Sequence, residues 1–433
     1  MRARRAVVAL TAVVLSGVLA AAGCRGASPA PAPLRPAWQP AVLPVPPGPP
    51  GVPVVRDAAA CMGRFYAAGA VRDAAGGTRP ALWSSADAVT WSAAAVRAVS
   101  FYGAQNVLYA VACRGRSVVA VGAKSGGVHG NPRVSAWRVA GGALVEVPAE
   151  FEVFGGPEAV AVSRVAGAPA GWLVAGSRVA GAAVWSWSPP DGGPLAVTTP
   201  GGTSTPDPSG VPGRGAAPGA GEPGAAELEP PAALPELAGD GRGRTTAHDV
   251  VAVPDGWLVV GDLLPPDGTG FLPVAWTSTD GRGWRRWPLP SAGAGGAAGG
   301  DGGSVRRVVL AGAAVVAVGP AGAGFAVWRR AAAGWELAAR FGAAGPEGAT
   351  GGGGVRSVVG LAARGARVVA AVSGDGAAVW SSGDAGSSWR PVMVPAERDG
   401  VSSVVVGDDR LVLFADGADG FRAWSTGFTK LDS

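Results

Sequence analysis

The chain has 433 residues, but it contains no isoleucine, only three tyrosines and only two histidines, His129 and His248. Histidine is the commonest metal ligand and proton carrier in active sites, so a zinc centre or histidine-based acid–base chemistry is a poor candidate for its activity. Charged residues make up only 15% of the chain, and lysine occurs only at positions 124 and 430. Arginine therefore supplies nearly all of the positive charge.

The composition is also unsuited to long helices. Glycine (72 residues) and proline (38 residues) together make up about a quarter of the chain, and both residues break helices. This argues against an all-helical protein. Disorder throughout is not expected either, because hydrophobic residues make up 48% of the chain and its 16 tryptophans need a core.

The formal net charge of +5 does not indicate a nucleic-acid partner. Arg2, Arg4 and Arg5 lie in a segment that we expect to be removed, and without them 33 basic residues face 31 acidic ones. Nucleic-acid surfaces need clustered positive charge. We therefore expect no nucleic-acid partner.

Residues 1–23 predict an export signal. A basic start is followed by an apolar run that is a little short for a membrane span. The segment Ala21-Ala22-Gly23-Cys24 resembles the bacterial lipobox, which implies that Cys24 carries a lipid anchor and becomes the mature N-terminus. The chain would then be exported and bound to membrane lipid at the outer face of the cytoplasmic membrane. The alternative is an ordinary signal peptide in which Cys24 has no role.

Residues 24–55 contain eleven prolines, a composition that favours extended conformations without a core. We predict a lipid-anchored tether here. At roughly 3.1 Å per residue it could hold a domain tens of ångströms from the bilayer. The apolar stretch Trp38–Leu43 is a candidate for an extra strand that docks on the domain.

Short apolar strands followed by an apolar-Trp pair recur seven times in the rest of the chain. The seven tryptophans are spaced by 54, 48, 91, 52, 52 and 44 residues, where 91 is one period plus an insertion. They are Trp83, Trp137, Trp185, Trp276, Trp328, Trp380 and Trp424. Each repeat has room for four short strands, and four-stranded units with this period are typical of β-propeller blades.

We therefore predict an all-β fold, a seven-bladed β-propeller of four-stranded antiparallel blades over residues 56–433. The indole rings are expected to pack between neighbouring blades rather than to bind a ligand. A Pro/Gly/Ala-rich insertion at about residues 199–245 has the composition of a linker, so we expect it to be disordered.

A turn motif recurs between the third and fourth strands of three repeats. The fullest copy, SGDAGSSW at residues 382–389, fits S-x-D-x-G-x-[ST]-W, and shorter copies lie at residues 85–91 and 278–284. The aspartate can accept backbone N–H bonds and the tryptophan can cap the hairpin, so a structural role is expected. These residues are Asp87, Asp280 and Asp384 with Trp91, Trp284 and Trp389. The motif resembles the Asp-box, or BNR repeat, so the chain resembles bacterial lipoproteins with a sialidase-like propeller.

This resemblance raises the question of sialidase activity. Sialidases of this architecture use an Arg-Ile-Pro segment, an arginine triad, a Tyr–Glu nucleophile pair and an aspartic acid. The chain has no isoleucine, and Arg79-Pro80 lacks the sialidase context. His248-Asp249 could belong to a Ser-His-Asp arrangement, but the sequence has no Gly-x-Ser-x-Gly motif to supply the serine. We therefore predict no catalytic residues and no enzyme activity, with a glycan-processing hydrolase as the alternative.

Metals and cofactors are not expected. The sequence shows no cluster of metal ligands, and its glycine runs follow neither the phosphate-loop nor the dinucleotide spacing. Cys61 and Cys113 fall near the ends of the innermost strands of adjacent repeats, eight and nine residues before the repeat glycines. In an exported domain this favours a disulfide between them. Two buried free thiols are the alternative.

Long irregular loops are expected on one rim of the propeller, and such loops commonly carry function. The polar candidates for binding on this rim are Arg72, Arg79, Lys124, His129, Arg133 and Asp262. No cluster of acidic residues and arginines could be assigned to the propeller axis. The predicted function is a non-enzymatic binding or scaffold module for an envelope protein, a glycan or a small ligand, and an assembly factor for a membrane complex is a further alternative.

Overall fold

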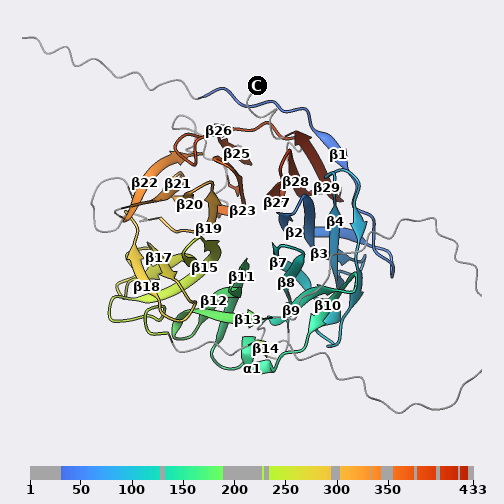
Figure 1. The fold of residues 1–433 in the computed structure, drawn as a ribbon, viewed down its shortest axis with the longest axis horizontal. Coiled ribbons are helices and arrows are strands. Elements are labelled where there is room, and N and C mark those ends of the chain that lie inside the picture. Colours follow the sequence, from blue (N-terminus) through green and yellow to red (C-terminus); the bar gives the residue numbers. More distant parts are fainter. Residues whose placement is uncertain are drawn as a thin grey trace, which may run out of the picture. The chain divides into compact units, whose positions relative to one another are not determined.

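Seven antiparallel sheets are arranged around a common axis in the computed structural model (Figure 1). The structure describes residues 31–126, 132–188, 227–228, 234–293, 303–332, 334–342, 355–374, 378–395, 400–417 and 420–427. The first strand of each blade contacts the first strands of both neighbours, and the first strand of the last blade contacts that of the first. The ring is therefore closed, and the predicted all-β, seven-bladed propeller is confirmed.

The strands of each blade follow one another from the axis outward. Blade 1 has β2 (Val52–Cys61), β3 (Arg64–Arg72), β4 (Thr78–Ser85) and β5 (Ser92–Ala93). Blade 2 has β7 (Val107–Arg114), β8 (Ser117–Lys124), β9 (Arg133–Ala140), β10 (Ala143–Val147) and, parallel to β10, β6 (Ala95–Arg97). Blade 3 has β11 (Ala159–Ala168), β12 (Gly171–Arg178), β13 (Gly181–Ser188) and β14 (Glu227–Leu228).

The remaining blades have the same order. Blade 4 has β15 (Arg244–Val253), β16 (Gly256–Leu264), β17 (Leu272–Ser278) and β18 (Arg285–Pro288). Blade 5 has β19 (Arg307–Ala311), β20 (Ala314–Ala321), β21 (Gly324–Ala331) and β22 (Gly334–Phe341). Blade 6 has β23 (Ser357–Arg364), β24 (Arg367–Ser373), β25 (Val379–Ser382) and β26 (Arg390–Pro391). Blade 7 has β27 (Gly400–Val406), β28 (Arg410–Gly417), β29 (Gly420–Gly427) and β1 (Gln39–Ala41).

Five repeats carry a glycine near the end of the second strand, and steric contacts explain why. The first strand of blade 1 carries a β-bulge between Val55 and Asp57, which moves its backbone toward the second strand. A Cβ atom on Gly69 would lie 1.7 Å from the carbonyl oxygen of Val54. At the corresponding place in blade 4, a Cβ atom on Gly261 would lie 1.9 Å from a backbone oxygen. Only glycine fits beside these bulges.

The hydrophobic core is divided among the blade interfaces. Seven clusters of buried side chains each draw residues from two adjacent blades, including one that joins blade 7 to blade 1. Six of the seven repeat tryptophans are buried and Trp380 is half-buried, so the packing role predicted for them is confirmed. Several of their indole N–H groups also donate to the connection that leads into the same blade; for example, Trp276 donates to the carbonyl of Glu236.

The ring is closed by a segment from the N-terminal side of the propeller. We call residues 32–49 the strap, because they run along the outer edges of blades 6, 7 and 1 (Figure 1). Leu34 bridges to blade 6, β1 pairs antiparallel with β29 of blade 7, and Val42 bridges to blade 1. The extra strand predicted within Trp38–Leu43 is therefore present, and it supplies the fourth strand that the seventh repeat lacks.

The strap differs from the free tether predicted over residues 24–55. Its prolines cannot donate hydrogen bonds, but their carbonyls accept them: Trp83 Nε1 donates to Pro44 O over 2.7 Å, and Arg79 Nη2 donates to the carbonyls of Pro46 and Pro49. Strand β2 begins at Val52, before the predicted domain start at residue 56. The part of the segment that the structure describes thus belongs to the propeller.

The predicted insertion is also shorter at its C-terminal end than expected. Residues 199–226 and 229–233 lie outside the described residues. Residues 234–245, in contrast, form an ordered turn and the start of β15. Leu237 is fully buried there, and the Trp276 indole holds the turn through the carbonyl of Glu236. Because Leu237 is buried in the propeller, residues 234–245 belong to the folded domain and not to the insertion.

A disulfide joins Cys61 at the end of β2 to Cys113 near the end of β7, with 6.1 Å between their Cα atoms. The bond links the innermost strands of blades 1 and 2. It closes a loop of 52 residues, and a loop of that length restricts the unfolded chain strongly.

Replacing both cysteines, Cys61→Ala with Cys113→Ala, is expected to lower the free energy of unfolding by about 2–4 kcal/mol. Chemical denaturation of the oxidised protein and the double variant measures this difference. Under a reductant, the wild type should approach the variant. Equal stability of the oxidised and reduced wild-type protein would contradict the expectation.

Candidate binding groove on the loop-rich face

One face of the propeller carries the blade-to-blade connections and the loops between second and third strands; we call it the loop-rich face. Large hydrophobic side chains are exposed on this face over blades 2 and 3, including Phe101 (76% exposed) and Phe151 (53% exposed). The group consists of Val99, Phe101, Tyr102, Phe151, Val160 and Val179. Exposed apolar side chains gathered in this way mark an interaction surface.

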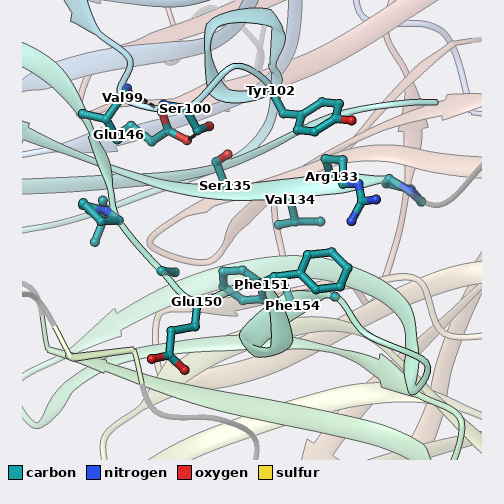
Figure 2. A pocket seen from close by; sticks show the side chains of 15 residues that line it. Val99, Ser100, Tyr102, Arg133, Val134, Ser135, Glu146, Glu150, Phe151 and Phe154 are labelled. Carbon is teal, nitrogen blue, oxygen red and sulfur yellow. Dashed lines mark hydrogen bonds between the residues drawn. The ribbon is translucent and has the colours of Figure 1, made fainter. Parts of the chain in front are cut away.

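A groove lies among these side chains between blades 2 and 3. It consists of two cavities of about 300 Å³ and 330 Å³ that share Pro132, Val134 and Phe154 in their linings. Figure 2 shows the first cavity, with Tyr102 on one side and Phe151 on the other. The lining is mostly apolar, a composition that is typical of ligand and peptide sites.

Glu146 holds one wall of the groove in place. This residue lies in β10 and is 4% exposed. Its carboxylate accepts hydrogen bonds from the backbone N–H groups of Val99 and Ser100, at 2.7 and 2.8 Å, and from Ser100 Oγ. A Cβ atom on Gly103 would lie 2.1 Å from the same carboxylate, so a larger residue there would displace Glu146. These contacts fix the short 3-10 helix η1 (Gly103–Gln105) and present Tyr102 to the groove.

The opposite wall is a single helical turn, α1 (Phe151–Phe154), in the connection from blade 2 to blade 3. Its place is fixed by the repeat tryptophan of blade 3, because Trp185 Nε1 donates to the carbonyl of Val153 over 2.7 Å. Phe154 is buried and packs against the Trp185 ring at 5.6 Å between ring centroids. Phe151 is left facing outward over the groove, as Figure 2 shows.

Arg133 lies between these two walls. It begins β9, and its guanidinium carbon lies 4.6 Å from the centre of the Phe151 ring and 5.5 Å from the centre of the Tyr102 ring. Both contacts are of the cation–π type. The sequence indicates Arg133 as a rim residue but not its aromatic neighbours, because they lie in connections that do not repeat.

The other predicted rim residues do not gather into one site. Arg72 is exposed at the end of β3, and Lys124 ends β8. Arg79 holds the strap through the proline carbonyls, and His129 lies outside the described residues. Among the five candidates that the structure describes, only Arg133 lines the groove.

The prediction that Asp262 is a binding residue on the rim is wrong, because its side chain is buried at 1% exposure. Its carboxylate accepts hydrogen bonds from the backbone of Val305 (3.0 Å) and from Ser304 Oγ (2.7 Å) in the segment that enters blade 5. His248 Nε2 lies 2.7 Å from the same carboxylate. Asp262 therefore joins blade 4 to blade 5 and is not available to a ligand.

The propeller axis holds a cluster of charged side chains, although none was predicted there from the sequence. Four side chains from the first strands of blades 1, 3, 4 and 5 meet there: Asp57, Arg164, Asp249 and Arg307. Arg307 Nε lies 3.1 Å from Asp249 Oδ2, Arg164 Nη1 lies 3.4 Å from Asp57 Oδ2, and Arg307 Nη2 lies 3.8 Å from Asp57 Oδ1. The two arginines also donate to the carbonyls of Tyr109 and Val359. We call these four residues the axial cluster.

The axial cluster has two positive and two negative side chains, and each arginine pairs with an aspartate of the cluster. Burial lowers the pKa of Arg164 and the nearby Arg307 lowers it further, whereas Asp57 and Asp249 raise it. Asp57 also accepts a hydrogen bond from the backbone of Val111 in blade 2. The cluster therefore ties first strands together across the ring.

A regular spacing in the sequence marks this cluster. Each of its four residues precedes the repeat glycine of the next strand by twelve positions: Asp57, Arg164, Asp249 and Arg307. In blade 1 this offset places the residue just after the β-bulge. The other blades have Ala110, Gly360 and Ser403 at the corresponding position. Aligning the repeats on their glycines would have found the cluster from the sequence.

The three turns with the Asp-box-like motif lie on the face opposite the groove, between third and fourth strands. In the first, Asp87 Oδ1 accepts hydrogen bonds from the backbone N–H groups of Val89 (2.9 Å) and Thr90 (2.7 Å). Asp280 and Asp384 accept corresponding backbone bonds in their own turns. The turns end on three buried tryptophans: Trp91, Trp284 and Trp389.

The stability that these turns contribute is expected to depend on pH. Burial opposes ionisation of Asp87, but hydrogen bonds from Val89 and Thr90 outweigh it and hold its pKa at about 2. A lowered pKa means that the charged form adds stability above the unfolded value of about 4, and that this stability is lost as the pH falls toward 2. Asp87→Asn should therefore be less stable than wild type at pH 7, with the difference closing between about pH 4 and pH 2. Urea unfolding at several pH values measures this, and a difference that does not change with pH would contradict it.

The described residues hold neither a metal-ligand cluster nor a helix suited to crossing a membrane. No three or more of their His, Cys, Asp or Glu side chains are grouped in a way that could hold a metal ion. None of the helices formed by these residues has the length and apolar character that crossing a membrane requires.

No protein-family model matches the sequence, and no curated protein matches it. Among solved structures, the chain is similar to YCF48 bound to a D1 peptide (11% identity, TM-score 0.47), covering 90% of this chain and 95% of that one. It is also similar to PorZ, a surface component of the type-IX secretion system of Porphyromonas gingivalis (12%, 0.49), and to the sialidase of Trypanosoma rangeli (10%, 0.39). The similarity to these two proteins covers 88% and 87% of this chain, but only 48% and 54% of theirs. At TM-scores below 0.5 these similarities carry no argument about function.

Proposed function

We propose that the chain is a non-enzymatic binding module of the cell envelope, and that the groove on its loop-rich face engages another envelope protein. The observation that carries this proposal is the group of exposed aromatic and aliphatic side chains around a preformed apolar groove. Such surfaces are costly to leave in water and are common at protein interfaces. The walls are held by Glu146 and Trp185, so the groove needs little rearrangement to bind.

The axial cluster supports a binding role over hydrolysis. A sialidase-like site would need arginines at the axis that are free to hold a substrate carboxylate. In this chain Arg164 and Arg307 are each paired with an aspartate of the protein itself. Their charge is already neutralised, and their hydrogen bonds go to neighbouring strands.

Retention of envelope proteins tests the binding role. Detergent-solubilised envelope from the producing cells is passed over immobilised protein, and retained proteins are quantified by mass spectrometry. We expect a set that native protein and Met62→Ala retain and that Phe151→Ala loses. Met62 is the matched control because it is 78% exposed in a turn on the opposite face. Turnover of fluorogenic glycosides by the protein, or retention that does not depend on Phe151, would overturn the proposal.

We further propose that the chain is exported and held at the outer face of the cytoplasmic membrane by a lipid on Cys24. Seven residues separate Cys24 from the strap, which begins at Ala32. Even fully extended, this linker reaches at most roughly 25 Å. The propeller would then lie close to the bilayer, with the anchor leaving from the outer edge of blade 6, where Arg390 donates to the carbonyl of Ala32.

The anchor is tested by Cys24→Ser. This change removes the thiol that would carry the lipid, so the protein should move from the membrane fraction to a soluble fraction. Fractionation with immunoblotting follows the protein, and mass spectrometry of the wild-type N-terminus should show a diacylglycerol-modified cysteine. An unmodified N-terminus upstream of Cys24 in the wild-type protein would refute the anchor.

A further inference from the structure

Two aromatic rings lie beside the guanidinium of Arg133. The rings of Phe151 and Tyr102 flank it at 4.6 and 5.5 Å, one on each side, as Figure 2 shows. The N–H groups of a guanidinium lie in its plane and point outward from its edge. An acceptor that pairs with Arg133 would approach in that plane, which is the geometry of a carboxylate that accepts two parallel hydrogen bonds.

Arg133 lacks such a partner within the described part of the chain. Its Nε atom is buried and donates to no described acceptor. Leaving a buried donor without an acceptor is unfavourable, which favours an acceptor that a partner brings to this guanidinium. The two carboxylates of the first cavity do not fill this role, because Glu146 is engaged by Val99 and Ser100 and Glu150 is exposed and points away from Arg133 in Figure 2.

The rest of the groove defines what must accompany the carboxylate. Val134 and Phe154 line both cavities and Val160 lines the second. This apolar surface suits apolar side chains better than the hydroxyl groups of a sugar. One face of each aromatic wall is already occupied by Arg133, which leaves less ring surface for stacking on a sugar. Glu150 stands at the other end and would repel a second acidic group, so the carboxylate is directed toward Arg133.

We propose that the groove takes an extended peptide segment in which an acidic side chain, seated on Arg133, is flanked by apolar side chains. This inference rests on the proposed binding function and names the chemistry that its partner would present. The carboxylate pairs with the edge of the Arg133 guanidinium, and the apolar neighbours lie over Val134 and Phe154.

Selection from a display library of random eight-residue peptides tests this chemistry without a known partner. Peptides are selected on immobilised native protein, and their affinities are then measured by fluorescence anisotropy. We expect an acidic residue at one fixed position beside apolar residues. Arg133→Met should weaken the selected peptides at least about tenfold, because a hydrogen-bonded charge pair contributes about 1.5–3 kcal/mol. Replacing the acidic residue of the peptide by its amide should weaken binding by a similar factor.

Two controls separate binding from folding and from net charge. Arg72→Met removes one positive charge from the same face and should leave the affinity unchanged. The melting temperature of Arg133→Met should match that of the wild type. Lys in place of Arg133 keeps the charge but not the planar geometry, so it should restore only part of the affinity.

The outcomes are distinct. Peptides without a fixed acidic position, affinities that Arg133→Met does not change, or failure to select any peptide would overturn the proposal. Binding of a labelled oligogalacturonate in place of peptides, lost in Arg133→Met, would assign the site to an acidic glycan and would also overturn it. If envelope proteins are retained through Phe151 while Arg133→Met has no effect, the acidic-peptide chemistry fails but the binding function stands.

Discussion

Replacing Arg307 with methionine is expected to lower the free energy of unfolding by about 3–5 kcal/mol, the range for removing one partner of a buried ion pair. Arg307 contacts both aspartates of the axial cluster, and its own side chain is only 11% exposed. Without it, Asp57 and Asp249 would share the single positive charge of Arg164 in a buried site. Chemical denaturation monitored by tryptophan fluorescence measures the loss.

A second substitution tests whether the unpaired carboxylate causes this loss of stability. Asp249→Asn in the Arg307→Met background removes the unpaired carboxylate and leaves Asp57 paired with Arg164, so part of the stability should return. Arg72→Met, at an exposed position, should change the stability by no more than about 0.5 kcal/mol. A loss for Arg307→Met of that same small size would show that the axial cluster does not hold the blades together.

Removing the strap is expected to have an effect of similar size. A chain that starts at residue 50 lacks Leu34 and Leu43, which are 5% and 6% exposed, and it lacks β1. Burial of two leucines contributes roughly 3–6 kcal/mol in total, and the exposed edge of β29 would be open to pairing with other chains. We expect a much lower melting temperature and aggregation, measured by calorimetry and light scattering.

The matched control is a chain that starts at residue 32. It lacks the signal and the lipid site but keeps the whole strap, so its melting temperature should equal that of the unlipidated mature chain. If the chains that start at residues 32 and 50 melt at the same temperature, the strap does not close the ring.

The fold could be predicted from the sequence because its information is repeated. Seven tryptophans at nearly regular spacing and a glycine in the second strand of five blades mark the same packing contacts in one blade after another. The disulfide followed from the same alignment, since Cys61 and Cys113 hold nearly equal positions in adjacent repeats. The strap was found only as the stretch Trp38–Leu43, because proline-rich composition does not reveal that residues 32–49 pack along the blade edges.

The groove could not be predicted because its parts do not repeat. Tyr102 and Phe151 lie in connections of unrelated sequence, and their positions depend on Glu146 and Trp185, which are distant in the chain. Arg133 was found as a charged residue on a long loop, without its neighbours. Asp262 was misplaced because a position at the end of a strand does not show that the next blade covers it.

The groove on the loop-rich face is expected to contact another molecule in the cell. Photo-crosslinking tests it most directly, with a photoreactive phenylalanine analogue in place of Phe151 and, in a matched strain, in place of Met62 on the opposite face. We expect a discrete crosslinked protein from position 151 and none from position 62. Adducts from position 62 alone, equal adducts from both positions, or no adduct at position 151 would contradict it.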